Sequence, residues 1–258
     1  MISRNAERPE VLVVDASDLR YALRHGWADF RRNPMFGLFF ASVYVLGGWL
    51  IYWAFTTDGK LWWTLPASAG FPILGPFIGC GLYEVSRRIE AGEPLDWRAV
   101  LTAIFRQKDR QIPSIAAVIV VFFLFWNFLA HMIFALFLGN AVMTNISTSL
   151  AVFATPEGMA MLALGSVIGA GFATLLFGLS VVSLPMLLER EVDFVTAMLT
   201  SLAVVRASPV VMLLWGAMIA VALFAAMVPA FLGLLLVLPL FGHASWHLYR
   251  RAIAWDVA

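Results

Sequence analysis

The sequence predicts an all-α, polytopic membrane protein with six transmembrane helices. The chain has 258 residues, of which 62% are hydrophobic and only 13% are charged, and its mean hydropathy is +0.87. Soluble domains average about 45–50% apolar and about 25% charged residues. The composition therefore excludes a soluble enzyme, a disulfide scaffold and a nucleic-acid-binding protein. Two further observations support the membrane class: long stretches without charge, and a one-sided distribution of Lys and Arg.

The uncharged stretches give the number of spans, because a transmembrane helix needs roughly 20 apolar residues. Five stretches contain no Asp, Glu, Lys or Arg: 33–57, 61–83, 111–156, 158–188 and 207–249. The last is long enough for two spans, divided near Pro229 to Gly233. In the third we expect one span, about 113–138, because residues 139–149 are polar and disfavour a helix. An ordered or re-entrant outer segment then leads to Glu157, and the total is six.

The distribution of basic residues sets the expected orientation. Of the 17 Lys and Arg residues, all but Lys60 fall on the same side of the six-span arrangement. Cytoplasmic loops carry the excess of Lys and Arg, so both termini are expected in the cytoplasm. A seventh span within 139–156 would move Arg190 and Arg206 to the opposite side, which also favours six.

Three segments before the odd-numbered spans share one pattern, an Asp followed 16 or 17 residues later by a Pro: 18–34, 96–113 and 193–209. Asp18, Asp96 and Asp193 are each placed to cap the free N–H groups of an amphipathic helix. Each Pro suits the first turn of the next helix, where no backbone donor is needed. We therefore expect a single membrane domain, 1–258, made of three repeats: about 18–83, 96–186 and 193–249. Residues 1–14 develop no apolar face and are expected to be a mobile tail.

Each repeat is expected to be an interfacial amphipathic helix followed by a transmembrane hairpin. The three apolar stripes are Leu19, Leu23, Trp27 and Phe30; Trp97, Val100, Leu101, Ile104 and Phe105; and Phe194, Ala197, Met198, Leu202 and Val205. Helices with Arg on the wet side and Trp or Phe toward lipid lie in the membrane interface. A solvated surface helix is the alternative for any one of them, but three in register favour the interface.

Two segments of the chain resemble a known family. Residues 183–201, Ser-Leu-Pro-Met-Leu-Leu-Glu-Arg-Glu-Val-Asp-Phe-Val-Thr-Ala-Met-Leu-Thr-Ser, and residues 242–251, Gly-His-Ala-Ser-Trp-His-Leu-Tyr-Arg-Arg, are similar to DUF2189. This family consists of integral membrane proteins of proteobacteria, and the resemblance extends over nearly the whole chain. It implies a location in the bacterial inner membrane. It supplies no substrate and no catalytic residue.

The second span is rich in helix-breaking residues. Pro72, Gly75 and Pro76 identify a possible path or ligand site, because interrupted helices can expose backbone groups near the bilayer midplane. Close helix packing is the favoured interpretation. Gly75 with Gly79, and Gly165 with Gly169 in the fourth span, form small-xxx-small pairs on equivalent helices.

Histidines and carboxylates offer weaker candidates. His243 and His247 are four residues apart and share a helix face, so with His25 they are the candidate metal ligands. Their nearness to Arg250 favours an anchoring belt instead, so no metal and no cofactor are expected. Aligning the two Arg pairs at 87–88 and 250–251 places Glu84 opposite His247, which predicts a contact between these two side chains.

The spans contain no Asp, Glu, Lys or Arg, which disfavours energised transport. No nucleophile, base and orienting acid can be assembled in one leaflet, so we expect no enzymatic activity. We expect an accessory protein, scaffold or assembly factor that contacts membrane lipids and other membrane proteins but no nucleic acid. The alternative is a passive transporter or lipid-handling protein, with a broken second span lining the path. A polar cavity beside Pro72 to Gly81 would favour the alternative, and a packed interior with an exposed lateral seam would favour the scaffold.

Overall fold

The computed structural model describes residues 9–58, 64–139 and 153–255, and these are almost entirely helical. The first half contains β1 (Pro9–Val11), α1 (Ala16–Arg32), α2 (Pro34–Asp58), α3 (Thr64–Ala91), α4 (Trp97–Arg106), the 3-10 turn η2 (Gln107–Asp109) and α5 (Ile112–Leu138). The second half contains α6 (Pro156–Ser180), α7 (Ser183–Glu189), α8 (Phe194–Ala207), α9 (Pro209–Met227), α10 (Leu234–Ala252) and β2 (Ile253–Trp255).

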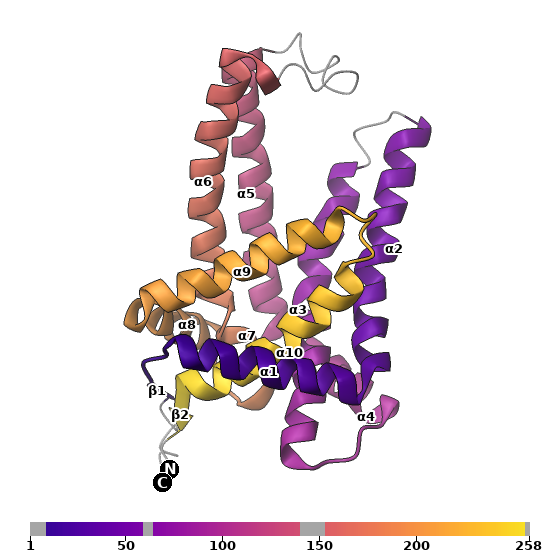
Figure 1. Ribbon diagram of the computed structural model, residues 1–258, viewed down its shortest axis with the longest axis vertical. Helices are drawn as coiled ribbons and strands as arrows, with labels where there is room; N and C mark the ends of the chain where they lie inside the picture. Colours follow the sequence, from indigo (N-terminus) through magenta and orange to yellow (C-terminus); the bar gives the residue numbers. More distant parts are fainter. Residues whose placement is uncertain (1–8, 59–63, 140–152, 256–258) are drawn as a thin grey trace.

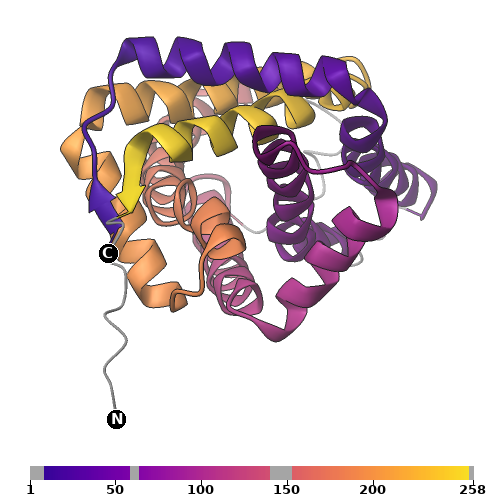
Figure 2. The same cartoon turned by 90° about the horizontal axis from the view of Figure 1, so that it is seen from below.

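The long helices run roughly parallel to one another, and shorter helices and helices that cross the long axis pack at one end of them. In Figure 1, α2, α3, α5 and α6 follow the long axis of the molecule, while α1, α9 and α10 cross it. Figure 2 shows the base from below, with α1 and α10 side by side along one edge and α4 on another side. We call the end that carries α1, α4 and α7 the basal end.

Among the described residues, four segments are long and apolar enough to cross a membrane: Pro34–Trp53, Ile112–Leu138, Pro156–Glu189 and Pro209–Met227. The chain is therefore an all-α integral membrane protein. The predicted second and sixth spans, α3 and α10, are not among the four. In α10 the basal half carries polar and basic side chains. In α3 the side chains are described only from residue 72, and this part includes the charged residues from Glu84 onward. The six-span organisation in three repeats stays a prediction.

The prolines lie where the sequence pattern predicts. Helices α2 and α9 begin at Pro34 and Pro209, and α5 has its Pro in the first turn. Asp96 caps α4 by accepting a hydrogen bond from the Ala99 N–H at 3.3 Å, and Asp193 likewise caps α8.

The cap of α1 corrects the prediction for Asp18. The N-cap is Asp15, whose carboxylate accepts hydrogen bonds from the N–H groups of Ser17 and Asp18. Asp18 lies one turn later and accepts the Asp15 N–H at 3.0 Å, which completes a capping box. Two Asp residues three apart both suit this helix start. The helix begins at Ala16, so Asp15 is the cap, and Asp18 binds both the Asp15 N–H and Arg251.

Residues 9–14 also differ from the expected mobile tail. β1 pairs in antiparallel fashion with β2, next to the C-terminal end of the described chain. Val14 is 2% exposed, and its N–H donates to the Ser208 hydroxyl at 2.9 Å. The alternating pattern here is that of a strand whose partner lies far away in sequence. Residues 1–8 of the predicted tail lie outside the described residues, as do Lys60 and most of the predicted outer segment (140–152).

The main core lies in the base, where α1, α3, α7, α8, α9 and α10 converge. Its largest fully buried side chains include Trp215, Trp246, Tyr249, Met186 and Met212. Part of the α1 stripe faces protein in place of lipid, because Ala22 and Gly26 bring α1 against α10.

Glycines mediate this close packing, but the tightest contacts are at positions other than those predicted. A Cβ added to Gly26 would lie 2.5 Å from the Ala244 nitrogen, and Gly81 and Gly242 are as tightly enclosed by Phe40 and Leu82. Of the predicted packing residues, Gly75 abuts Tyr44 and Gly169 abuts Trp126. Two predictions need correction: the atoms nearest to an added Cβ on Gly79 belong to Tyr83 of its own helix, and an added Cβ on Gly165 meets no atom within 4 Å. The α5–α6 hairpin is open at Gly165, which sequence spacing alone does not reveal.

Candidate functional site

A charge-lined cavity opens between helix ends at the base, and we call it the basal cavity. Its volume is about 1210 Å³, and α3, α4, η2, α7 and α10 contribute to its walls. Six Arg and six acidic residues line it: Arg87, Arg88, Arg98, Arg106, Arg110, Arg250, Glu84, Glu90, Asp96, Asp109, Glu189 and Glu191. The formal charge of the lining therefore cancels.

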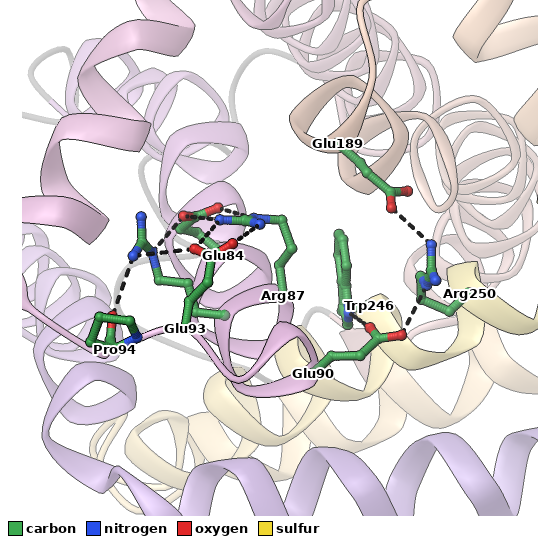
Figure 3. Close-up of polar contacts among 9 residues, drawn as sticks. Glu84, Arg87, Glu90, Glu93, Pro94, Glu189, Trp246 and Arg250 are labelled. Atoms are coloured by element: carbon green, nitrogen blue, oxygen red, sulfur yellow. Dashed lines mark hydrogen bonds and ion pairs between the residues drawn. The ribbon is translucent and has the colours of Figure 1, made fainter. Parts of the chain in front are cut away.

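The first wall is an ion-pair cluster at the end of α3, shown in Figure 3. Glu84 is 4% exposed and accepts hydrogen bonds from Arg87 at 2.8 Å and Arg88 at 2.7 Å. The spacings of three and four residues place all three side chains on one helix face. Glu93 accepts two more hydrogen bonds from Arg87, because Gly92, at φ +67°, turns the chain back over the helix end. The Glu84 carboxylate raises the pKa of Arg87, and Arg87 lowers the pKa of Glu93.

The second wall is formed by contacts among α3, α10 and α7, in which Glu90 and Arg250 take part (Figure 3). The Trp246 indole donates to Glu90 at 2.8 Å, and Arg250 donates to Glu90 at 3.1 Å. Arg250 also donates to Glu189 at 2.8 Å, and the Tyr249 hydroxyl donates to the same carboxylate. One guanidinium thus connects three helices whose residues are far apart in sequence.

The third wall is α4 with η2. Arg98, Thr102 and Arg106 are four residues apart, so they share one helix face, and all three line the cavity. Within the described parts of the chain, Arg98 and Arg106 form no hydrogen bond or ion pair, unlike the arginines of the other two walls. The Gln107 side chain is buried beside them, and no described residue donates a hydrogen bond to its Oε1. This wall therefore holds unused donors and acceptors.

The candidate histidines do not assemble into a metal site. His247 Nε2 lies 2.7 Å from Asp29 on α1, and the His25 ring is 5.4 Å from the His247 ring. His243 points elsewhere, with Nδ1 2.9 Å from the Ser86 hydroxyl. Over the ranges that the structure describes, no three His, Cys, Asp or Glu side chains are grouped to hold a metal.

The predicted contact between Glu84 and His247 is wrong. Glu84 binds the arginines of its own helix, and His247 binds Asp29. Helices α3 and α10 do meet, but Ser86 faces His243 and Glu90 faces Trp246. The register of contacts between α3 and α10 therefore differs from the one predicted by aligning Arg87–Arg88 with Arg250–Arg251. His247 faces α1 instead of α3.

The candidate path residues lie in a continuous helix. α3 runs as one helix through Pro72 and Pro76, so the interrupted helix of the transporter alternative is not seen at these residues. Gly75 is in contact with the Tyr44 side chain, and Gly81 with Phe40. The basal cavity lies at the other end of α3, beyond Glu84.

These walls fall mainly within a segment that comparison with known families identifies. Residues 64–189 match the DUF2189 family. Its description is a predicted integral membrane protein, and the predicted resemblance is thereby confirmed for these residues but not over nearly the whole chain. The DUF2189 segment runs from the first residue of α3 to the last residue of α7. The segment includes residues 183–189, the beginning of the first motif that carried the resemblance. The rest of that motif and the whole of the second, residues 242–251, lie outside it. No curated protein and no solved structure matches the chain.

Several functional candidates escaped the sequence analysis. The Glu84, Arg87 and Arg88 cluster has a readable signal, namely opposite charges three and four residues apart on a helix. The Asp29–His247 pair has no signal that can be read from the sequence, because 218 residues separate the two side chains. The free pair Arg98 and Arg106 is visible only once the partners of the other four arginines of the basal cavity are known.

Proposed function

We propose that this protein is a non-catalytic accessory or scaffold protein of the bacterial inner membrane. In this proposal α3 and α10 also span, which gives six spans in three repeats, and the basal end faces the cytoplasm. The four apolar segments establish a membrane protein. The cytoplasmic orientation is supported by the basic residues of α1, α4 and α10, which gather at the basal end.

Packing around α3 supports a scaffold over a transporter. A passive transporter needs a polar path beside Pro72 to Gly81. In this region Ile73 and Leu74 are exposed apolar side chains, while Gly81 is closed against Phe40 and Pro76 is buried. The helix therefore has one face toward lipid or a partner and one packed face.

The outer face of α6 is the observation that carries the proposal. It is a stripe of exposed and mostly small residues spaced three and four apart: Ala160, Ala163, Val167, Gly171 and Thr174. Small residues let membrane helices approach closely, whereas bulky apolar residues suit lipid. The exposed stripe on α5 is bulky by comparison, with Val121, Phe125, Phe128, Met132 and Leu136. This stripe supports the proposal as its lateral seam, although bulky Leu162 and Leu164 are exposed beside it.

Site-specific photocrosslinking in the native membrane tests this proposal. A photoreactive residue is placed at Val167 on α6, and the matched control is placed at Val221 on α9, since the two side chains are 72% and 69% exposed. We expect one defined protein adduct at 167 and only lipid adducts at 221. Lipid adducts alone at both positions would contradict the scaffold.

A pair of substitutions separates lost binding from lost folding. Ala163→Leu fills the α6 seam, and Ala220→Leu adds the same volume to an exposed alanine on α9. We expect only the first to abolish the adduct formed at 167, with both variants equally stable in detergent. Loss of the adduct in both would show that crosslinking does not depend on this face.

The lipid-handling alternative retains one supporting observation, the basal cavity with its unpartnered polar groups. A lone protein that co-purifies with a defined lipid, without a protein adduct at 167, would favour it.

A further inference from the structure

The basal cavity is a candidate for a ligand because of what α4 presents to it. Arg98 and Arg106 lie two turns apart, about 12 Å along the helix axis, with Thr102 between them. The residues beside them on this face are Ala99 and Ala103, which leave room above the helix. Two guanidinium groups therefore flank an open strip of small side chains.

The two arginines are the unused cations of the cavity. Arg87, Arg88, Arg110 and Arg250 each bind at least one carboxylate. Arg98 and Arg106 bind none among the residues with described positions. A guanidinium offers several N–H donors in a planar fork that matches phosphate oxygens. The α4 face therefore has the chemistry to hold a phosphate group.

The adjoining turn η2 offers the opposite chemistry. Gln107 is 4% exposed, and its Oε1 has no hydrogen-bond donor. Leaving such a buried acceptor unpaired costs about 1–3 kcal/mol. Two residues later, the Asp109 carboxylate also lines the cavity and has no partner in the described chain. A ligand that donates N–H or O–H bonds and tolerates a neighbouring negative charge would satisfy these groups.

We propose that the basal cavity binds the phosphoethanolamine headgroup of a membrane lipid. The phosphate lies on the α4 face against Arg98 and Arg106, and the primary ammonium donates to Gln107 Oε1 and Asp109. A headgroup without net charge fits a lining whose formal charges cancel. This binding site goes beyond the scaffold proposal, since it involves neither α6 nor a protein partner.

The position of α4 favours a lipid over a soluble phosphate. Phe105 is 68% exposed and Trp97 38% exposed on the flank of α4, and Trp97 stacks on Phe36 of the membrane helix α2. Exposed aromatic residues of this kind anchor a helix at the boundary between headgroups and acyl chains. The arginine face then lies at the depth of lipid phosphates.

The chemistry predicts a ranking among lipids. Phosphatidylcholine has the same phosphate and the same net charge, but its quaternary ammonium carries no N–H donor for Gln107. Phosphatidylglycerol has the phosphate and hydroxyl donors, but no cation to place beside Asp109. Phosphatidylethanolamine alone among the three satisfies all the unpartnered groups.

Native mass spectrometry of the full chain, released from micelles with equal amounts of the three lipids, tests the ranking. We expect phosphatidylethanolamine to be retained over the other two by about tenfold, the effect of one charged hydrogen bond. Equal retention of all three, or preference for phosphatidylglycerol, would overturn the proposal. Glycerophosphoethanolamine without acyl chains serves as competitor, and displacement of the lipid at equal concentration would overturn the assignment to a lipid.

Three variants locate the site. The double variant Arg98→Gln and Arg106→Gln should lose retention of all three lipids, and Gln107→Leu should lose only the preference for phosphatidylethanolamine over phosphatidylcholine. Lys108→Gln is the matched control, because it removes a neighbouring charge outside the cavity lining. Arg98 and Arg106 have no partner among the described residues, so we expect folding to be unaffected, which unfolding temperatures verify. Unchanged retention in the folded double variant would place the lipid elsewhere and end the proposal.

Discussion

His247 Nε2 on α10 lies 2.7 Å from Asp29 Oδ2 on α1, and each side chain is about nine-tenths buried. The pair joins the first and last helices of the described chain. Beside it, Gly26 of α1 and Ala244 of α10 are in backbone contact. A polar joint in such close packing is satisfied only while both partners remain, because neither side chain can reach water easily.

Removing one member of this pair is expected to destabilise the base. Asp29→Ala leaves the His247 ring without its acceptor, and we expect a loss of about 3 kcal/mol in the free energy of unfolding. Denaturant titration in detergent measures it. A double-mutant cycle supplies the control: Asp29 and His247 should couple, whereas Glu84 and His247 should not. Coupling between Glu84 and His247 would contradict the observed register.

Gly26 is expected to tolerate no side chain. Its Cβ position lies 2.5 Å from the backbone of Ala244, so Gly26→Ala forces α1 and α10 apart and should cost about 1–3 kcal/mol. Gly165→Ala is the control, since nothing lies within 4 Å and alanine favours the helix. Unfolding temperatures of the two variants should move in opposite directions. A stable Gly26→Ala protein would show that the two helices are not this close.

The ion-pair cluster on α3 should depend on Glu84. Glu84→Gln removes the buried carboxylate that neutralises Arg87 and Arg88, and we expect a loss of about 3 kcal/mol. Glu191→Gln breaks a pair with Arg110 whose acidic partner is 84% exposed, so it should cost less than about 1 kcal/mol. Equal effects of the two substitutions in a thermal unfolding assay would contradict the difference in burial.

The N-terminal strand region should contribute to stability. Val14 is 2% exposed and Val13 is 76% exposed, so Val14→Ala should lower stability by about 1–2 kcal/mol while Val13→Ala has little effect. Limited proteolysis of the two variants, followed by mass spectrometry, provides the comparison. Identical protection of β1 in both would favour the mobile tail expected from the sequence.

Local sequence signals predicted the membrane class, the prolines at Pro34 and Pro209 and the caps at Asp96 and Asp193. Each of these features depends on a few neighbouring residues or on the distribution of charge, and both can be read from the sequence. Pairing between residues far apart in the chain could not be predicted from such local signals. A helix pattern does not say that His247 faces α1 rather than Glu84, nor that β1 pairs with β2. The cap at Asp15 was missed because both Asp residues suit this helix start, and the spacing to Pro34 indicated Asp18.

Orientation is the claim on which the scaffold and the lipid site both depend, and cysteine labelling measures it directly. The buried Cys80 is replaced by Ser, and single cysteines are introduced at the exposed residues Lys108 and Leu232. With six spans and a cytoplasmic base, a membrane-impermeant maleimide should label position 232 on intact spheroplasts and position 108 only in inverted vesicles. If only the four apolar segments crossed, the two positions would exchange sides, and that result would contradict the account.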